Sequence, residues 1–207
     1  MQLEEVLNRL HLNLKNGLAG WEAQKMMSPP FREKPDMNLI QEQNPRYSAV
    51  LLLIYEKDES THIVLTQRHR YEGAHSGQIS FPGGKKERNE ALIDTSMREC
   101  AEEIGVLVEV SNILTPLSEL YIPPSNFLVS PFLAYLPYSP IFLKQESEVA
   151  SIIEIDLNEL FNKENKKDVE VQIGAGQTLN VPAYVINNYV IWGATAAILS
   201  EFEQLIQ

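Results

Sequence analysis

The sequence predicts a single mixed α/β domain that carries an extra helix at its N-terminus. Apolar runs of strand-like length or alternation fill the middle of the chain, and apolar residues at helical spacing occur near both ends and within residues 90–104. Strands flanked by helices favour a mixed α/β architecture. The 207 residues, of which 44% are apolar, suffice for one sizeable core.

The N-terminal part is predicted to be a helix and a connector that pack on the core. Residues 3–14 place five apolar side chains at helical spacing, namely Leu3, Val6, Leu7, Leu10 and Leu14. Residues 28–45 contain several prolines, which predict an irregular connector. We therefore expect a helix and connector in residues 1–45 and the core domain in residues 46–207.

The core is expected to begin with strands that lead into a helix. The apolar runs 47–55 and 61–67 predict adjacent strands joined by a polar turn, and a short strand at 78–81 follows. A helix is expected over residues 90–104, with Gly105 as its C-terminal stop. The buried side of this helix should consist of Leu92, Met97, Cys100, Ala101 and Ile104.

The rest of the chain is expected to add strands and a closing helix. Strand-like patterns occupy residues 108–120, 126–136 and 149–155, and residues 169–189 favour extended structure. Apolar residues at helical spacing within 191–206 predict the C-terminal helix.

Composition and charge narrow the classes of partner and compartment. A formal net charge of −11 argues against a general nucleic-acid surface, and no apolar run has the length of a membrane span. The N-terminus lacks the basic leader and apolar segment of a signal peptide. The single cysteine, Cys100, excludes an intrachain disulfide. We therefore expect a cytoplasmic protein without nucleic-acid or membrane partners.

Glu99, Glu102 and Glu103 form a dense carboxylate cluster on the predicted helix. Their i, i+3 and i+4 spacing places them on one helix face, where like charges repel by roughly a few tenths of a kcal/mol per pair. An acidic surface helix is the alternative, but it explains neither the preceding glycines nor Arg98. Mg²⁺ binds oxygen ligands, through a few carboxylates together with substrate phosphates. The cluster therefore predicts a metal-dependent site for a phosphorylated substrate.

Residues 84–106 resemble the signature of the Nudix hydrolases, G-x5-E-x7-R-E-U-x-E-E-x-G-U, in which U is a bulky aliphatic residue. The matching residues are Gly84, Glu90, Arg98, Glu99, Glu102, Glu103, Gly105 and Val106. Cys100 departs from the first U position, where a small apolar thiol can still pack. The resemblance implies the Nudix fold, an α/β/α sandwich around a mixed sheet.

The same resemblance implies roles for the matching residues. The metal, Mg²⁺ or Mn²⁺, would be held by Glu99, Glu102, Glu103 and the backbone carbonyl of Gly84. Glu102 would also be catalytic. Arg98 and Glu90 would form an ion pair that orients the loop against the helix, without a part in the chemistry.

The resemblance also implies a general base or a further ligand from a later loop, where such a residue often lies in this family. Two glutamates, Glu146 and Glu148, precede the predicted strand 149–155. Glu148 is preferred because a glutamate followed by valine and a strand resembles the family pattern. The alternative is that both glutamates belong to an exposed acidic loop.

A second resemblance, just upstream, is to the coenzyme A diphosphatases, with the pattern L-L-T-x-R-[SA]-x3-R-x3-G-x3-F-P-G-G. The matches are Leu65, Thr66, Arg68, Gly77, Phe81, Pro82, Gly83 and Gly84. His69 replaces Ser or Ala, and Gly73 replaces the second Arg, for which Arg70 is a nearby substitute. Lys85 and Lys86 are further local cations. Substrate contacts are expected from Arg68, Arg70, His75, Gly77 and Phe81.

These resemblances leave three hypotheses. The first is a metal-dependent diphosphatase that cleaves coenzyme A or its thioesters, giving 3′,5′-ADP and 4′-phosphopantetheine. The second keeps the chemistry but takes ADP-ribose, a dinucleotide or a nucleotide sugar, as the missing cation at Gly73 permits. The third is a non-catalytic ligand sensor, which the complete set of motif carboxylates disfavours. The partner is a small nucleoside diphosphate derivative, and a homodimer is left open.

Overall fold

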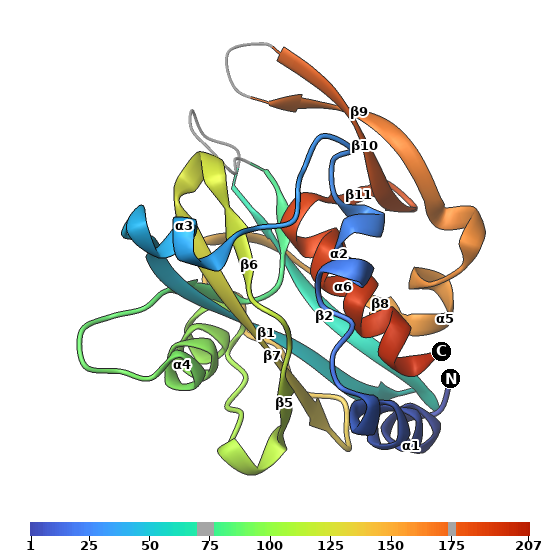
Figure 1. Cartoon of the computed structure of the whole chain (residues 1–207). Helices are drawn as coiled ribbons and strands as arrows, with labels where there is room; N and C mark the ends of the chain where they lie inside the picture. Colours follow the sequence, from blue (N-terminus) through green and yellow to red (C-terminus); the bar gives the residue numbers. More distant parts are fainter. Residues whose placement is uncertain (70–76, 174–176) are drawn as a thin grey trace.

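The computed structural model describes residues 1–69, 77–173 and 177–207, and it has three layers (Figure 1). A mixed sheet lies between helix α4 on one face and helices α1 and α6 on the other. The predicted α/β fold with an N-terminal helix is therefore confirmed. Arg70 and His75, two expected substrate contacts, lie outside the described residues, as does Gly73.

The central sheet has eight strands within the described residues. They are β1 (Arg46–Lys57), β2 (Ser60–Arg68), β3 (Ile79–Ser80), β4 (Gly83–Lys85), β5 (Ile113–Pro116), β6 (Leu120–Ile122), β7 (Phe127–Leu136) and β8 (Val149–Asp156). β1 is parallel to β7 and antiparallel to β2 and β4, which makes the sheet mixed. β3 and β8 also pair with β2, and β5 and β6 pair with β7.

The side chains of β1 are apolar on both faces because helices cover both sides of the sheet. Those that pack in the layer of α1 and α6 are Leu52 and Ile54, and those that pack in the layer of α4 are Leu51, Leu53 and Tyr55. Cys100 and Ile104 of α4 complete the second layer. The unbroken apolar run in the sequence is therefore a strand buried from two sides.

The described helices are α1 (Leu3–Asn13), α2 (Trp21–Gln24), α3 (Met37–Glu42), α4 (Leu92–Ile104), α5 (Leu157–Leu160) and α6 (Gly193–Ile206). Short 3₁₀ turns add Leu14–Asn16, Lys25–Met27, Val110–Asn112, Pro123–Ser125 and Lys163–Asn165. No described helix is both long and apolar enough to cross a membrane.

The prediction of an irregular connector at residues 28–45 was wrong in one part, because this segment contains helix α3. The carboxylate of Asp36 caps α3 by accepting from the backbone N–H of Asn38 at 2.9 Å. A helix of six residues shows too few turns for its periodicity to stand out in the sequence. α1 and α2 both contact α6, so the N-terminal segment packs on the C-terminal helix.

Helix α4 differs from its prediction at its start and on its buried face. It begins at Leu92, with Ala91 as N-cap, so Glu90 lies in the loop before it. The buried face consists of Thr95, Ser96, Cys100, Glu103 and Ile104. Three residues expected to be buried, Leu92, Met97 and Ala101, are half-buried. The helix instead turns Glu103 inward, toward the backbone of β4.

Two other segments also differ from expectation. Residues 108–120 form a 3₁₀ turn and the short strand β5 rather than one strand, and β5 ends at Pro116, which lacks a donor for a longer ladder. Helix α6 starts at Gly193 because Tyr189–Trp192 form strand β11. β11 pairs with β10 (Gln177–Ile186), and β10 pairs with β9 (Lys166–Ile173), in an antiparallel sheet that projects from the body (Figure 1).

Candidate active site

The centre of the site is the contact between strand β4 and helix α4. Gly84 lies opposite Ala49 of β1, and α4 packs across both strands. A Cβ atom at Gly84 would lie within 2.7 Å of both carboxylate oxygens of Glu99. The missing side chain at Gly84 leaves room for the carboxylate of Glu99, and a Cβ at Gly83 would clash with the backbone of Ala49 and Val50 in β1.

Glu103 is buried beside Glu99, with 4% of its surface exposed. One of its carboxylate oxygens accepts the backbone N–H of Gly83 at 3.1 Å. Burial raises the pKa of Glu103 to about 7, and the charges of Glu99 and Glu148 add to the rise, whereas the Gly83 N–H and Arg68 oppose it. The ionised form of Glu103 is therefore costly without a further positive charge.

Burial also disfavours the ionised form of Glu99. Desolvation raises its pKa, the charges of Glu102 and Glu148 contribute to the rise, and Arg98 opposes it. The side chain of Glu99 is 13% exposed. Two adjacent carboxylates, Glu99 and Glu103, are thus both largely removed from water.

The structure separates the two candidate glutamates of the later loop. Glu148 is close enough for its charge to raise the pKa of both Glu99 and Glu103. The carboxylate of Glu146 instead pairs with Lys144 at 2.9 Å, and its side chain is 80% exposed. Glu148, and not Glu146, therefore adds its charge to the buried pair.

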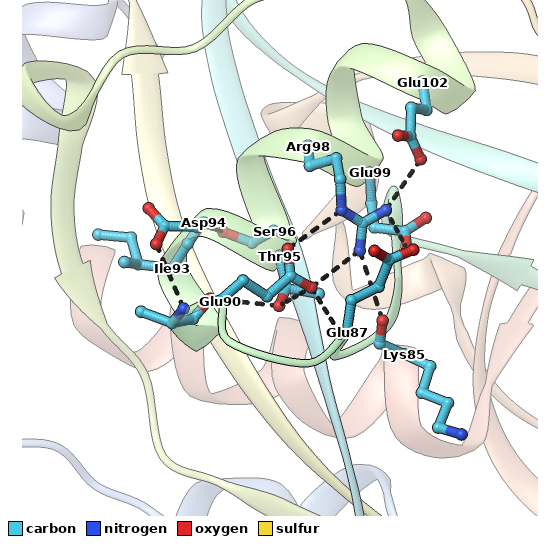
Figure 2. A network of polar contacts seen from close by, with 11 residues as sticks. Lys85, Glu87, Glu90, Ile93, Asp94, Thr95, Ser96, Arg98, Glu99 and Glu102 are labelled. Atoms are coloured by element: carbon cyan, nitrogen blue, oxygen red, sulfur yellow. Dashed lines mark hydrogen bonds and ion pairs between the residues drawn. The ribbon is translucent and has the colours of Figure 1, made fainter.

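Arg98 lies among three motif carboxylates (Figure 2). Its Nε and Nη2 donate to the two carboxylate oxygens of Glu90 at 3.2 and 3.0 Å. Its Nη1 donates to both Glu99 and Glu102, each at 2.9 Å, and Nη2 reaches the carbonyl of Lys85 at 3.4 Å. Sequence reasoning paired Arg98 only with Glu90, although the i, i+4 spacing to Glu102 was a signal for the second contact.

Glu90 is the best-satisfied carboxylate of this network. Besides Arg98, it accepts the backbone N–H of Glu87 at 2.7 Å and the hydroxyl of Thr95 at 2.8 Å. The Arg98 guanidinium, followed by these donors, lowers the pKa of Glu90 to about 2. The loop between β4 and α4 is thereby tied to the helix.

The residues fit a hard divalent cation by donor chemistry, although no group of three is preassembled. In the described part of the chain, no three His, Cys, Asp or Glu side chains converge as a ready metal site. Glu102 is 56% exposed on its side chain and is bound to Arg98. Glu99 and Glu103 nevertheless offer desolvated carboxylate oxygens, the ligand type that such cations select.

The expected substrate contacts have different surroundings. The Nε of Arg68, at the end of β2, is buried and has no hydrogen-bond partner within the described ranges, and its charge reaches Glu103. Gly77 donates its N–H to the carbonyl of His69 at 3.2 Å. Phe81 is 2% exposed and packs in the core on the α6 side, so the prediction that it contacts substrate does not hold for its side chain.

An open hollow of about 690 Å³ adjoins Glu99. It is lined by Lys85, Lys86, Glu87, Arg88, Asn89 and Glu99. Its three cations, Lys85, Lys86 and Arg88, take part in none of the ion pairs formed by the described residues. Sequence reasoning did not identify this hollow, because it depends on how the loop between β4 and α4 folds back on the helix.

Comparison with known proteins assigns the family. The family profile described as NUDIX domain matches residues 45–172. A protein of Photorhabdus laumondii called uncharacterized Nudix hydrolase NudL is 31% identical over 188 residues, which cover 89% of this chain and 94% of that protein. A Yersinia enterocolitica protein of the same name is 32% identical over 79% of this chain and 83% of its own length.

A solved structure supports the fold alone. The MutT/nudix family protein from Enterococcus faecalis matches with a TM-score of 0.59 and 16% identity, over 84% of this chain and 71% of that one. The profile and the relatives agree with the motif read from residues 84–106. The chain therefore belongs to the Nudix hydrolase family.

Proposed function

We propose that this chain hydrolyses the diphosphate linkage of a nucleoside diphosphate derivative in a reaction that depends on Mg²⁺ or Mn²⁺. The observation that carries the proposal is the pair of desolvated carboxylates, Glu99 and Glu103, held against a glycine strand and next to the charge of Glu148. Buried carboxylates without a matching cation are costly, and a bound divalent ion removes that cost.

The proposed metal ligands are Glu99, Glu102, Glu103 and the backbone carbonyl of Gly84. A cation bound there would neutralise phosphate oxygens and activate water. To bind the metal, Glu102 would have to give up its contact with Arg98. The family resemblance also makes Glu102 a catalytic candidate. Glu148 would accept the proton of the attacking water, because it is the loop carboxylate whose charge reaches the buried pair.

The other residues of the site would position the substrate. The bidentate contact of Arg98 with Glu90 holds the loop that presents Gly84. The cations of the neighbouring hollow would attract the anionic substrate into a protein whose formal net charge is −11. Arg68, whose buried Nε lacks a partner in the described part, is a candidate for a substrate phosphate.

Within this class of reaction, we propose coenzyme A or its thioesters as the substrate, with 3′,5′-ADP and 4′-phosphopantetheine as products. The support is the match to the coenzyme A diphosphatase pattern at residues 65–84. Gly73 replaces one cation of that pattern, and Lys85, Lys86 and Arg88 are available in its place around the hollow. ADP-ribose, a dinucleotide or a nucleotide sugar is the second candidate.

A substrate panel tests both levels of this proposal. Nucleoside diphosphate derivatives are incubated with Mg²⁺, Mn²⁺ or EDTA, and the products are identified by mass. We expect hydrolysis with either metal and none with EDTA. Binding of a nucleotide without hydrolysis of any member of the panel would contradict the enzyme and favour the ligand sensor.

The value of kcat/KM then distinguishes the substrates. Coenzyme A differs from its 3′-dephospho analogue by one phosphate, and a charge-assisted contact of about 1.5–3 kcal/mol corresponds to a preference of about tenfold or more. Equal values would mean that no cation recognises the 3′-phosphate. A clear preference for ADP-ribose would exclude coenzyme A while the hydrolase itself stands. Light scattering on the same sample distinguishes a monomer from a homodimer.

A further inference from the structure

The loop that carries Glu148 is docked on the C-terminal end of α4. The backbone N–H of Leu143 donates to the carbonyl of Ile104 at 2.8 Å, and that of Gln145 donates to the carbonyl of Glu103 at 3.0 Å. The last carbonyls of a helix have no partner within the helix. Here the loop supplies partners for two of them, one of which belongs to the buried site residue Glu103.

Gly105 is what lets the loop come so close. Its φ of 72° lies in the left-handed region, and its N–H donates to the carbonyl of Ala101 at 3.0 Å. A Cβ atom at this position would lie 2.6 Å from the Cβ of Leu143, 3.1 Å from its carbonyl oxygen and 3.2 Å from its Cα. Glycine is therefore needed twice, once for its backbone conformation and once for the approach of the loop.

A second contact fixes the loop from the side of strand β2. The Nε2 of His69 lies 3.0 Å from the carbonyl oxygen of Glu146. The N–H groups of Glu148 and Val149 both donate to the carbonyl of Gln145, at 3.1 and 2.9 Å, and Val149 begins strand β8. Glu148 is thus held in a turn between the docked residue Gln145 and the sheet.

We propose that Gly105 is a positioning residue for Glu148. By allowing Leu143–Gln145 to dock on the last turn of α4, Gly105 sets the place of Glu148 relative to Glu99 and Glu103. The helix that carries the metal-binding candidates then also fixes the loop that carries the proton acceptor. This inference rests on the catalytic role proposed above for Glu148.

The primary test is Gly105→Ala, with Gly17→Ala as the matched control. Gly17 also has a positive φ, of 83°, but a Cβ there would meet nothing within 4 Å, so the control reports backbone strain alone. We expect Gly105→Ala to lower kcat by on the order of a hundredfold, the cost of displacing a catalytic group by about 1 Å. Gly17→Ala should keep the kcat of the wild type. Equal kcat in both variants would overturn the proposal.

Amide hydrogen exchange measures the docking itself. In Gly105→Ala, the N–H groups of Leu143 and Gln145 should lose protection, while the central amides of α4 keep it. The double variant Gly105→Ala/Leu143→Gly removes the closest contact and should recover at least about tenfold of the lost kcat. Protection of both amides at the wild-type level in Gly105→Ala would contradict the docking role. If Gly105→Ala does not fold, Gly105→Asn takes its place, because asparagine tolerates the left-handed conformation while its Cβ still meets Leu143; it should lose kcat and protection in the same way, and wild-type kcat would overturn the proposal.

A double-mutant cycle shows whether Gly105 acts through Glu148. In the Glu148→Gln background, Gly105→Ala should change kcat by no more than about twofold, because the group it displaces is already absent. A further fall in kcat of about a hundredfold in the double variant would contradict the proposal, because Gly105 would then act without Glu148. Wild-type kcat in Glu148→Gln would overturn the role of Glu148 and this inference together. The proposal of a metal-dependent hydrolase would not be affected by that result, because Glu103→Gln tests it separately.

All kcat values are measured with coenzyme A and Mn²⁺, or with ADP-ribose if the panel shows that it is cleaved faster.

Discussion

Two helices on opposite faces of the sheet bury glutamates in contrasting ways. Glu103 of α4 and Glu203 of α6 are each 4% exposed. Glu203 accepts two bonds from Lys166, at 2.7 and 2.6 Å, and others from Tyr184 and Gln207, each at 3.0 Å. Among the described hydrogen bonds, the carboxylate of Glu103 accepts only that from the backbone N–H of Gly83.

Glu201 of α6 makes the same contrast sharper. It is fully buried and accepts bonds from the backbone and hydroxyl of Ser118, the backbone of Gly20 and the amide of Gln24. These bonds hold the N-terminal segment and the chain before β6 on α6. The buried carboxylates of α6 are therefore supplied with several donors, whereas the equally buried carboxylate of Glu103 has a single neutral donor. This difference in donors at equal burial is the reason for proposing the site on the α4 side of the sheet.

The largest expected effect separates Glu103 from Glu203. Glu103→Gln removes a charge and a metal ligand at nearly constant shape, and kcat should fall by on the order of a thousandfold while the fold persists. Glu99→Gln should behave alike. Glu203→Gln is the control and should keep kcat near that of the wild type. Steady-state kinetics at saturating metal check this, and near wild-type turnover in either folded site variant would refute the ligand assignment.

Glu201→Leu should show the opposite pattern. It leaves the donors of Ser118, Gly20 and Gln24 buried and unpaired, and we expect a loss of at least about 3 kcal/mol in the free energy of unfolding. The kcat per folded molecule should stay near the wild-type value. Denaturant unfolding measures this loss in the free energy of unfolding. The same measurement on Glu103→Gln in EDTA gives the comparison with a glutamate of the site. A stable Glu201→Leu protein would show that these bonds do not hold the N-terminal segment.

Without metal, the free energy of unfolding should depend on pH in two separate ranges and with opposite sign. The pKa of Glu103 rises in the folded state from 4.5 to about 7, so the folded state binds more protons and stability falls as pH rises from about 4.5 to 7, by up to about 3 kcal/mol. The pKa of Glu90 falls from 4.5 to about 2, so its contribution is lost as pH falls through that lower window. Unfolding in EDTA across pH measures both.

Single variants assign each pH window to its residue. Glu103→Gln should flatten the slope between about pH 4.5 and 7, leaving the share of Glu99, whose pKa is also raised, and should keep the acidic slope in place. Glu90→Gln should instead flatten the acidic slope, to which Glu154 and Asp156, whose pKa values are also lowered, contribute as well. An upper slope as steep in Glu103→Gln as in the wild type would assign that titration to another group.

Arg98→Ala should give a smaller and mixed effect. It leaves Glu90 and Glu99 without their shared cation and loosens the loop that presents Gly84, so stability should fall by about 2 kcal/mol together with activity. Thermal unfolding and kinetics on the same sample check this. Lost activity with unchanged melting temperature and metal affinity would instead indicate a direct phosphate contact by Arg98.

Features set by local sequence were predictable, and features set by tertiary approach were not. The motif from Gly84 to Val106, strands β1 and β2 and the helix stop at Gly105 follow from spacing and residue type. The burial of Phe81 and the reach of Arg98 to the carbonyl of Lys85 depend on how the elements pack. The docking of Leu143 on α4 joins residues that no periodicity connects.

Thermal unfolding with increasing Mn²⁺ tests most directly whether the unmet charge of the site is a metal site. The wild type and Glu203→Gln should both gain stability, by about 2.7 kcal/mol when the metal concentration reaches 100 times Kd. Glu103→Gln should gain little at the same concentrations because it lacks a buried ligand. An equal gain in Glu103→Gln and the wild type would contradict the account, since the metal would then bind elsewhere.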